Sequence, residues 1–441
     1  MAEESITIPE ALRQPADAWS IARPIAFRFC FVYFILFALS NQIVNSIFII
    51  PKIDVPDPAS WWPFRLGVLW VGRHVLRIKT ELVYQDTGSG DKSFDWVLIL
   101  CLLAVSLIAT AIWSWLDRRR IGYPVLSKWF QLFLRFALGS QLLSYGATKF
   151  VPLQMPFPYL FKLVEPLRNF SPMGVLWTSV GISPAYEIFT GGAELAAGFL
   201  LIFPRTAVLG ALLAMADMIQ VFVLNMTYDV SVKLLSFHLV VMSLLFLAPN
   251  IRQLFNFFFT NKSAALAAPE PLFNSSRANR NARVALAALW IWMIGVNVYV
   301  DWDGWHQYGP GQPQSELAGI WDIQQLAIDG QPQPLAVSNP DEWRRIIFDL
   351  AVRAQIQHMD DSLTGYDAAL DTQKQTLALT TGSNKNWRAD FTYSRPAKDT
   401  LILDGTVNGH KQHIELKLMD STKFTLTSRG FNWVQDRPFN R

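Results

Sequence analysis

Three ionisable residues, Glu194, Asp217 and His238, lie near the middle of separate apolar stretches, and Arg135 lies near the middle of a fourth. Each stretch is long enough to cross a bilayer. Ionisable groups at that depth are costly, so they usually face a protein interior, where they mark a functional site or a buried ion pair. Because carboxylates and histidine can exchange protons, we interpret Glu194, Asp217 and His238 as candidate catalytic residues.

The helices that position these residues are predicted from apolar runs of about 20 residues, the length that spans a bilayer. Seven spans are expected, at 27–50, 96–116, 129–148, 184–203, 206–225, 233–250 and 284–300. An odd number of spans places the two ends of the chain on opposite sides of the membrane. The first span lacks a small-residue cleavage pattern and is interpreted as a signal anchor.

Basic residues predict the orientation of these spans, because loops rich in Lys and Arg stay in the cytoplasm. The basic residues concerned follow the second span, join the fourth to the fifth, and lie between the sixth and seventh: Arg118, Arg119, Arg120, Arg205, Arg252, Lys262, Arg277, Arg280 and Arg283. We therefore expect a multi-pass protein of the bacterial inner membrane, with the N-terminus in the cytoplasm and the C-terminal domain outside. The loop 51–95 runs against the rule with Arg65, Arg73, Arg77 and Lys79.

Composition divides the chain into six parts. We expect a cytoplasmic segment 1–26, two spans with an outer loop 51–95 in 27–128, a four-helix membrane core 129–260, a cytoplasmic linker 261–283, a seventh helix 284–301 and an extracytoplasmic β-domain 315–441. Within the outer loop, the aromatic run 61–71 is too short to span and is predicted to lie at the membrane interface.

The β-domain is predicted from a change of pattern after Glu316, where short alternating or apolar runs, 424–427 among them, are separated by turn residues. Asn408-Gly409 favours a two-residue hairpin turn. About eight or nine short strands predict a meandering antiparallel barrel, with a β-sandwich as the alternative. A barrel of this size can hold a ligand or be filled by side chains.

Two positions in the β-domain, Gly319-Ile320-Trp321 and Arg429, resemble the lipocalin-type signature, in which an early tryptophan packs under a late arginine. The run from Ser428 to Arg441 is expected to be the closing strand with a C-terminal seal. The alternative is a docking strand on the outer mouth of the bundle.

Helical spacing relates the charges of neighbouring spans. Arg135 and Lys149 are fourteen residues apart, and Glu187 and Glu194 are seven apart, so each pair shares one helix face. Because the third and fourth spans run in opposite directions, we expect Lys149 to meet Glu187 near the outside and Arg135 to approach Glu194 near the centre.

A second polar group is expected beside Lys149 and Glu187, as the mouth of the central site: Asn225, Tyr228, Asp229 and Lys233. The candidate binding residues are therefore Arg135, Lys149, Glu187, Tyr228, Asp229 and Lys233. The alternative is that these charge pairs only fix the helix register, as buried pairs can without any chemistry.

Cysteine usage and charge exclude some functions. The two cysteines, Cys30 and Cys101, lie inside predicted spans, and no C-x-x-C occurs, so a dithiol relay or a cysteine-ligated metal has too few ligands. We expect no metal site and no nucleic-acid partner. The glycines at 139, 146, 191, 192 and 198 are expected to let the third and fourth spans pack closely.

Residues 129–258 are similar to the DoxX family of four-helix membrane proteins. The similarity rests on Arg135-Phe-Ala-Leu-Gly139, Gly146-Ala-Thr-Lys149, the Gly191-Gly192 pair and Tyr228-Asp229-Val-Ser-Val-Lys233. Arg135, Lys149 and Glu194 match the polar helix positions of that family, and Asp217 and His238 match more loosely. The extra spans and the β-domain lie outside the family pattern, and a thiol-exchange role finds no suitable cysteines here.

The resemblance implies membrane-associated redox work, like that of the quinone-reducing subunit of thiosulfate oxidation systems. One hypothesis is thus a subunit of a quinone-linked oxidoreductase in the lipid bilayer, with a quinone as cofactor and a redox partner protein as electron donor. Glu194, Asp217 and His238 would manage protons, and Arg135 or His238 would bind a quinone oxygen. The alternatives are a non-enzymatic carrier of a lipid or small hydrophobic molecule, or an envelope scaffold.

Overall fold

The computed structural model describes residues 22–53, 55–120, 122–260, 271–335, 339, 341–381 and 384–440. Most of the expected segment 1–26, and Lys262 with the first part of the linker, lie outside the described residues. The chain forms two compact units, one of residues 1–148 and 190–300 and one of 149–189 and 301–441. The first is a helical bundle and the second carries an antiparallel barrel, so the predicted fold class is confirmed.

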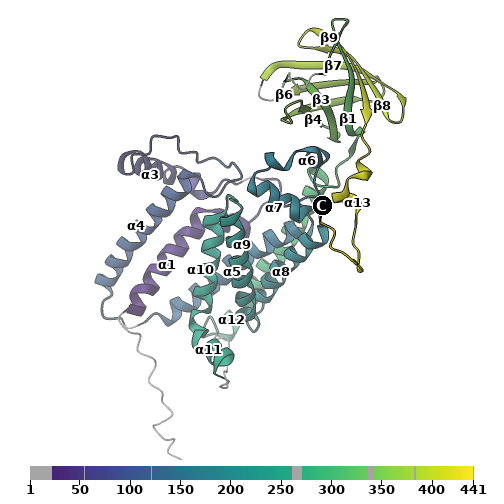
Figure 1. Cartoon of the computed structure of the whole chain (residues 1–441). Coiled ribbons are helices and arrows are strands. Elements are labelled where there is room, and N and C mark those ends of the chain that lie inside the picture. Colours follow the sequence, from purple (N-terminus) through teal and green to yellow (C-terminus); the bar gives the residue numbers. More distant parts are fainter. Residues whose placement is uncertain are drawn as a thin grey trace, which may run out of the picture. The chain divides into compact units, whose positions relative to one another are not determined.

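The helices, with the bounds that the structure gives them, are α1 (Ala22–Ser40), α2 (Gln42–Ile47), η2 (Pro58–Ser60), α3 (Phe64–Trp70), η3 (Val71–Val75), α4 (Ser93–Leu116), α5 (Pro124–Phe150), α6 (Leu160–Val164), η4 (Leu167–Asn169), α7 (Pro172–Gly181), α8 (Pro184–Ile202), α9 (Ala207–Thr227), α10 (Lys233–Leu247), η5 (Ala248–Asn250), α11 (Ile251–Phe259), α12 (Ser276–Gln307), η6 (Ser421–Lys423) and α13 (Thr425–Ser428). In the helical unit, α1, α4, α5, α9 and α10 run side by side (Figure 1).

Six of the described helices are long and apolar enough to cross a membrane: α1, α4, α8, α9, the continuous Lys233–Phe259 and α12. This indicates a multi-pass membrane protein. The span predicted at 129–148 forms as the helix α5, but α5 is not among the six, because side chains such as Lys128, Arg135 and Gln141 make it less apolar. It is nevertheless part of the bundle core through Leu134, Leu138 and other buried residues.

The first predicted span, at 27–50, is wrong in its extent. Helix α1 ends at Ser40, and the Asn41 side chain caps the next helix, α2, by accepting the backbone N–H of Ile43 at 3.0 Å. An asparagine cap favours a new helix start over continuation of the old one. The break directs Gln42, the first residue of α2, toward polar partners described below.

Arg28 joins three segments at one end of the bundle. Its guanidinium is buried and donates to the Tyr123 hydroxyl at 2.9 Å, to the Ser114 hydroxyl at 2.9 Å and to the Asp117 carbonyl oxygen at 3.0 Å. A buried charge is tolerated only when its donors are satisfied in this way. The contacts tie α1 to the end of α4 and to the chain that leads into α5.

The loop between α1 and α4 has two features. Its predicted interfacial run, 61–71, contains α3, and Trp62, Phe64 and Trp70 are exposed there, as expected for side chains that face headgroups. Further on, the Asp91 carboxylate accepts the backbone N–H groups of Lys233 at 2.8 Å and Leu234 at 2.9 Å. Asp91 thereby caps α10 and fixes this loop to the helical unit.

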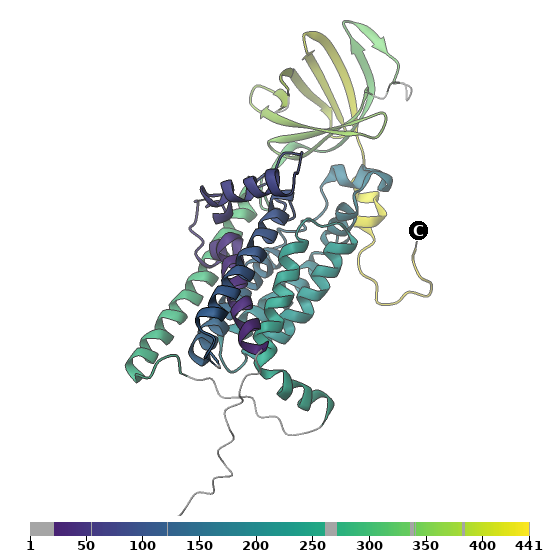
Figure 2. The same cartoon turned by 90° about the vertical axis from the view of Figure 1, so that its left-hand side faces the viewer.

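The strands are β1 (Gln314–Ile328), β2 (Gln331–Gln333), β3 (Trp343–Leu350), β4 (Arg353–His358), β5 (Leu363–Asp371), β6 (Thr376–Thr381), β7 (Asn384–Ala397), β8 (Thr400–Val407) and β9 (His410–Leu418). Neighbours in sequence pair antiparallel from β3 to β9, and β1 pairs with both β3 and β9. This pairing closes the meander into a barrel, while β2 extends β1 as a short hairpin (Figure 2). The predicted Asn408-Gly409 turn joins β8 to β9, with both residues at positive φ.

Side chains fill the interior of the barrel. Trp321, Phe348, Leu379, Leu403 and Ile414, which come from five different strands, are each 0–1% exposed and belong to one apolar cluster. Inward and outward residues alternate along each strand, as the sequence pattern predicted. The barrel is therefore a packed core, which is the side-chain-filled alternative.

The predicted lipocalin-type pairing of Trp321 with Arg429 is wrong. Trp321 donates its indole N–H to the Leu317 carbonyl oxygen at 2.8 Å, and the guanidinium near its ring, at 5.4 Å, is that of Arg395 on β7. Arg429 instead lies over the Phe439 ring at 4.1 Å. The expected strand at 424–427 and the expected closing strand from Ser428 are wrong as well, because Thr425–Ser428 form α13 and residues 429–440 have no regular structure.

The segment 149–189 belongs to the barrel unit, unlike the predicted division with a core at 129–260. The Asp349 carboxylate of β3 accepts the Leu160 N–H at the start of α6, at 2.8 Å. Gln357 donates to the Val164 carbonyl oxygen at 3.2 Å, and Arg168 pairs with Asp361 at 2.8 Å. These polar contacts dock α6 and η4 on the barrel.

Trp321→Ala should lower the free energy of unfolding of the barrel by about 3–5 kcal/mol, because it leaves a large cavity and removes a buried hydrogen bond. Denaturant titration of the full chain, followed by protease protection of the barrel, measures the change. Trp433→Ala is the control, because Trp433 is 90% exposed. Equal stability of the two variants would contradict the assignment of Trp321 to the barrel core.

The docking of α6 should depend on pH through Asp349. Burial raises the pKa of this carboxyl, opposed by the backbone N–H groups that it accepts. The contribution of Asp349 to the stability of the docked α6 is therefore largest below the ordinary pKa of about 3.9. It declines as pH rises through the raised pKa. Asp349→Asn keeps an acceptor oxygen and should remove this pH dependence, whereas Asp349→Ala should remove both the pH dependence and the capping hydrogen bond, which costs about 1 kcal/mol relative to Asp349→Asn. Hydrogen exchange of the α6 amides reports the docking, and an unchanged pH profile in Asp349→Asn would refute the role.

Candidate functional site

Glu194 lies where the backbones of α5 and α8 approach each other closely. A Cβ atom on Gly146 would be 2.9 Å from the Leu195 nitrogen and 3.0 Å from both the Glu194 Cβ and the Gly191 carbonyl oxygen. Glycine permits this approach because it carries no side chain. The contact buries Glu194 to 1% exposure and brings its carboxylate beside the polar residues of α5.

These neighbours are Gln141 and Tyr145, one helical turn apart on α5, and Gln42 at the start of α2. The Gln42 amide nitrogen donates to the Gln141 side-chain oxygen at 2.9 Å and to the Tyr145 hydroxyl at 2.8 Å. Glu194 interacts electrostatically with Tyr145. We call Gln42, Gln141, Tyr145 and Glu194 the polar cluster.

One donor of the polar cluster is not used by the protein. Gln141 is 1% exposed, and its amide nitrogen has no hydrogen-bond partner within the described part of the chain. A buried donor left in this state costs about 1–3 kcal/mol. Such a donor in an apolar bundle points to an acceptor atom on a bound molecule.

Sequence reasoning identified Glu194 but missed the other three members. The signal for Gln141 and Tyr145 was their spacing of four residues, which places them on one face of α5. Gln42 could not be assigned, because the predicted first span continued through it to residue 50. The cap at Asn41 decides its position.

Arg135 does not have the expected role beside Glu194. Its guanidinium donates to the carbonyl oxygens of Leu201 and Ile202, the last residues of α8. Leu201 is seven residues beyond Glu194, about 10 Å along the helix axis. The final carbonyls of a helix lack intrahelical partners and attract cations, so Arg135 caps α8.

His238 lies in an aromatic cage between α1 and α10. Its Nδ1 donates to the Leu234 carbonyl oxygen at 2.6 Å, so Nε2 is the acceptor for the Tyr33 hydroxyl at 2.7 Å. The Phe37 ring stacks on the imidazole with centroids 3.9 Å apart. Both nitrogens are engaged, and this geometry holds α1 against α10.

Asp217, the third predicted catalytic residue, is half-buried on α9. Helix α9 packs on α8 through Gly210, where a Cβ atom would be 2.9 Å from both the Leu200 Cβ and the Leu201 nitrogen. Asp217 thus lies seven residues along α9 from a close contact with the helix that carries Glu194.

Lys149 and Glu187 are both buried in the barrel unit. Glu187 accepts the Met155 backbone N–H at 2.7 Å, and the charge of Lys149 acts on its carboxylate. The structure therefore places these two residues together, at the end of α5 and the start of α8. Their contacts also hold the chain that leaves α5.

The other expected mouth residues stabilise the turn between α9 and α10 in the helical unit. Asn225 donates to the Ser236 hydroxyl at 3.0 Å, and Lys233 pairs with Asp229 at 2.9 Å and with Asp91 at 3.7 Å. Tyr228 is the C-cap of α9. Asn225, Asp229 and Lys233 therefore hold this turn in place.

Metal ligands do not gather in the described residues, where no group of three or more His, Cys, Asp or Glu could hold an ion. Cys30 and Cys101 are both free thiols. The fold and the site together define a multi-pass helical protein with a buried polar cluster and a closed, filled β-barrel.

Comparison with known proteins adds a partial relative. The chain is 38% identical over 84 residues to the uncharacterized protein YwoB of Bacillus subtilis (strain 168). This match covers 19% of the chain and 54% of that protein, so the chain spans about half the length of this curated relative. No family model matches the sequence, and no solved structure matches it.

Gly146→Ala should weaken the contact that positions Glu194, because the added methyl group meets α8 backbone atoms that cannot move independently. We expect a loss of about 1–3 kcal/mol, the usual cost of overpacking. Gly192→Ala is a matched control on α8, since a Cβ atom there meets nothing within 4 Å. Thermal unfolding in detergent compares the two variants, and equal midpoints would disprove the close contact.

Proposed function

We propose that this protein is a DoxX-like membrane subunit of a quinone-linked oxidoreductase, and that the polar cluster binds the quinone ring. The observation that carries the proposal is the buried Gln141 amide nitrogen without a protein partner. A quinone offers carbonyl oxygens, which accept hydrogen bonds, on an apolar body that suits a helical bundle.

In this proposal, one quinone oxygen accepts hydrogen bonds from the Gln141 amide and the Tyr145 hydroxyl. Reduction of a quinone to its quinol consumes two electrons and two protons. A redox partner protein with its own electron-carrying centre supplies the electrons. Glu194 exchanges protons at the ring oxygen, and Asp217 on the adjacent α9 is the second candidate carboxylate.

The geometry changes the roles proposed for the remaining residues. Arg135 caps α8 and His238 joins α1 to α10, so we assign both to holding the helices and not to the quinone. Lys149 and Glu187 lie together at the end of α5 and the start of α8, and we retain them as a charged pair that could bind a ligand. Tyr228, Asp229 and Lys233 are assigned to the α9–α10 turn.

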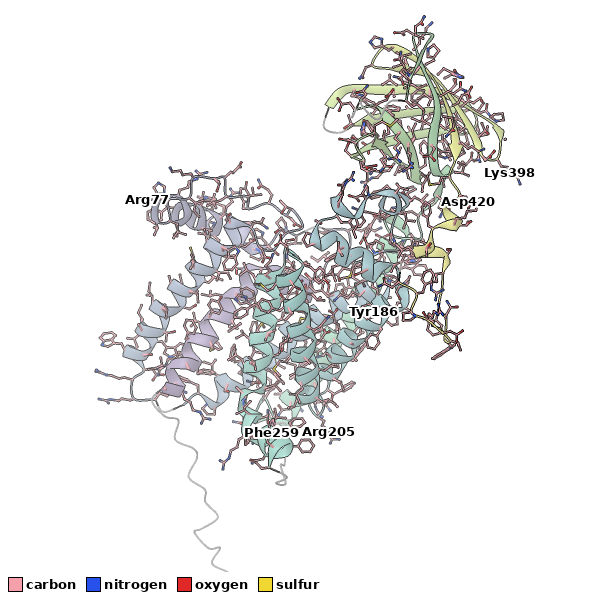
Figure 3. The ribbon with its side chains drawn as sticks, in the orientation of Figure 1. Arg77, Tyr186, Arg205, Phe259, Lys398 and Asp420 are labelled. Atoms are coloured by element: carbon pink, nitrogen blue, oxygen red, sulfur yellow. The ribbon has the colours of Figure 1, made fainter. Side chains whose placement is uncertain are left out.

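We further propose a bacterial cytoplasmic membrane location, with the N-terminus inside and the barrel outside. Arg118–Arg120, Arg205 and Arg252 support this orientation through the positive-inside rule. Arg205 and Phe259 lie at the same end of the helical unit, and Arg77 lies at the opposite end (Figure 3). The outer loop with Arg77 would therefore face away from the cytoplasm.

A carrier of lipids or other apolar molecules is the second candidate, because an ester carbonyl could accept the same Gln141 hydrogen bond. The filled interior of the barrel gives no support to transfer of a ligand through that domain. The two candidates therefore differ in the molecule that the polar cluster prefers.

Gln141→Leu should weaken binding of a short-chain quinone about tenfold in nanodiscs, which is about 1.4 kcal/mol and the scale of one hydrogen bond. Ser243→Ala is the control, since Ser243 is buried on α10, donates to the Leu239 carbonyl oxygen at 2.9 Å and lies outside the polar cluster. Equilibrium titration gives the two dissociation constants, and mass spectrometry identifies molecules that purify with the protein. The carrier function would be favoured if quinone binding did not saturate and a phospholipid, and no quinone, purified with the protein.

Glu194→Gln should retain quinone binding but abolish quinone-dependent activity, because the amide is similar in shape and does not exchange protons. Proton uptake during reduction of the bound quinone, followed with a pH indicator, measures this loss. The folded yield must match that of the unsubstituted protein. Loss of folded protein in Glu194→Gln would instead show that Glu194 serves only as a buried structural charge.

A further inference from the structure

The segment that follows the barrel, Phe424–Asn440, presents large apolar side chains to the outside. After α13 it has no regular structure, and Phe431, Trp433 and Val434 are 77%, 90% and 82% exposed. Leu426 in α13 is also exposed. An apolar group of this kind on a protein surface usually marks an interaction site.

Contacts within the segment hold this group outward. Arg429 lies over the Phe439 ring and donates to the Gln435 side-chain oxygen at 3.3 Å. The chain therefore bends back on itself, with residues 431–434 at the bend. Phe431 and Trp433 pack edge to face, with ring centroids 5.0 Å apart, and form one aromatic wedge.

The segment leaves the barrel at the end where the chain enters it. Leu418, the last residue of β9, pairs with Trp321 of β1, and the Met419 N–H donates to the Ile320 carbonyl oxygen at 2.8 Å. Strand β1 begins a few residues after α12, one of the six helices that could cross a membrane. Within the barrel unit, Lys398 and Asp420 lie at this same end, toward Tyr186 (Figure 3).

Exposed aromatic residues at the helix ends of the barrel unit mark the level of the membrane interface. Trp302 and Tyr308 are exposed at the end of α12, and Tyr186 and Phe189 are exposed at the start of α8. Trp and Tyr concentrate at the two surfaces of a bilayer, where their rings reach the headgroup layer. The apolar group of the segment is therefore joined to a unit that is itself anchored at that level.

We propose that residues 431–434 insert into the outer headgroup layer of the bilayer and anchor the barrel to the membrane surface. Phe431, Trp433 and Val434 enter the boundary between headgroups and acyl chains, as the apolar residues of interfacial anchors do. Arg437, exposed beyond the bend, is available to lipid phosphates. The occupant of this surface is phospholipid, and the anchor is independent of the quinone site.

A spin label tests this placement in the full chain in nanodiscs of phosphatidylcholine and phosphatidylglycerol. Asn432→Cys carries the label in a Cys30→Ala, Cys101→Ala background, so that both flanking aromatic residues remain. Asn408→Cys, in the turn between β8 and β9 at the other end of the barrel, is the matched control. We expect the label at 432 to collide readily with oxygen and rarely with a water-soluble nickel chelate, and the label at 408 to show the opposite pattern.

Adding Trp433→Asp should move the label at 432 into water and raise its collisions with the nickel chelate severalfold. Protease protection of the barrel must remain unchanged, which separates loss of the anchor from loss of the fold. Strong nickel accessibility at 432 without this substitution would overturn the proposal. Shielding from both reagents would overturn it as well, because the segment would then be buried against protein, either this chain or a second copy.

Discussion

The helix α5 must keep polar side chains inside an apolar bundle, and much of the structure of the helical unit follows from this constraint. In hydrocarbon no water is present to satisfy such groups, so each must find a partner on another helix. Arg135 does so at the last carbonyls of α8, and the side-chain oxygens of Gln141 and Tyr145 do so through Gln42, which leaves the Gln141 amide nitrogen for a ligand. Next to Tyr145, Gly146 lets α8 approach closely enough to place Glu194 beside Tyr145.

The barrel was predictable from the sequence because the patterns that determine it, strand alternation and turn residues, are local in the chain. Alternation along each strand sets the inward face, and Asn408-Gly409 sets one hairpin, so the closed meander follows with little tertiary input. The arginine beside Trp321 was not predictable in this way. Arg395 and Arg429 both follow late strand-like runs, and only the helical turn at 421–428 removes Arg429 from the sheet.

The membrane site was predictable only in part. Hydropathy places Glu194 and His238 at depth, but it does not say which side chains saturate them. His238 is satisfied by Tyr33 and by a carbonyl of its own helix, which depends on how α1 packs against α10. Gln42 depends on a single cap at Asn41 that ends one helix and starts another. Tertiary partners therefore decide which buried polar groups remain available for a ligand.

Two helices of the candidate site, α5 and α8, extend past the residues at which the helical unit ends. Helices α5 and α8, which carry three of the four residues of the polar cluster, both continue into the barrel unit. There Glu187 accepts the Met155 N–H under the charge of Lys149, and the same connection is docked on β3 and β4 through α6. The barrel has a core of its own side chains, such as Trp321, Phe348 and Leu403. Within the barrel unit, the contacts of Glu187 and Asp349 therefore hold the connection between the end of α5 and the start of α8 in place.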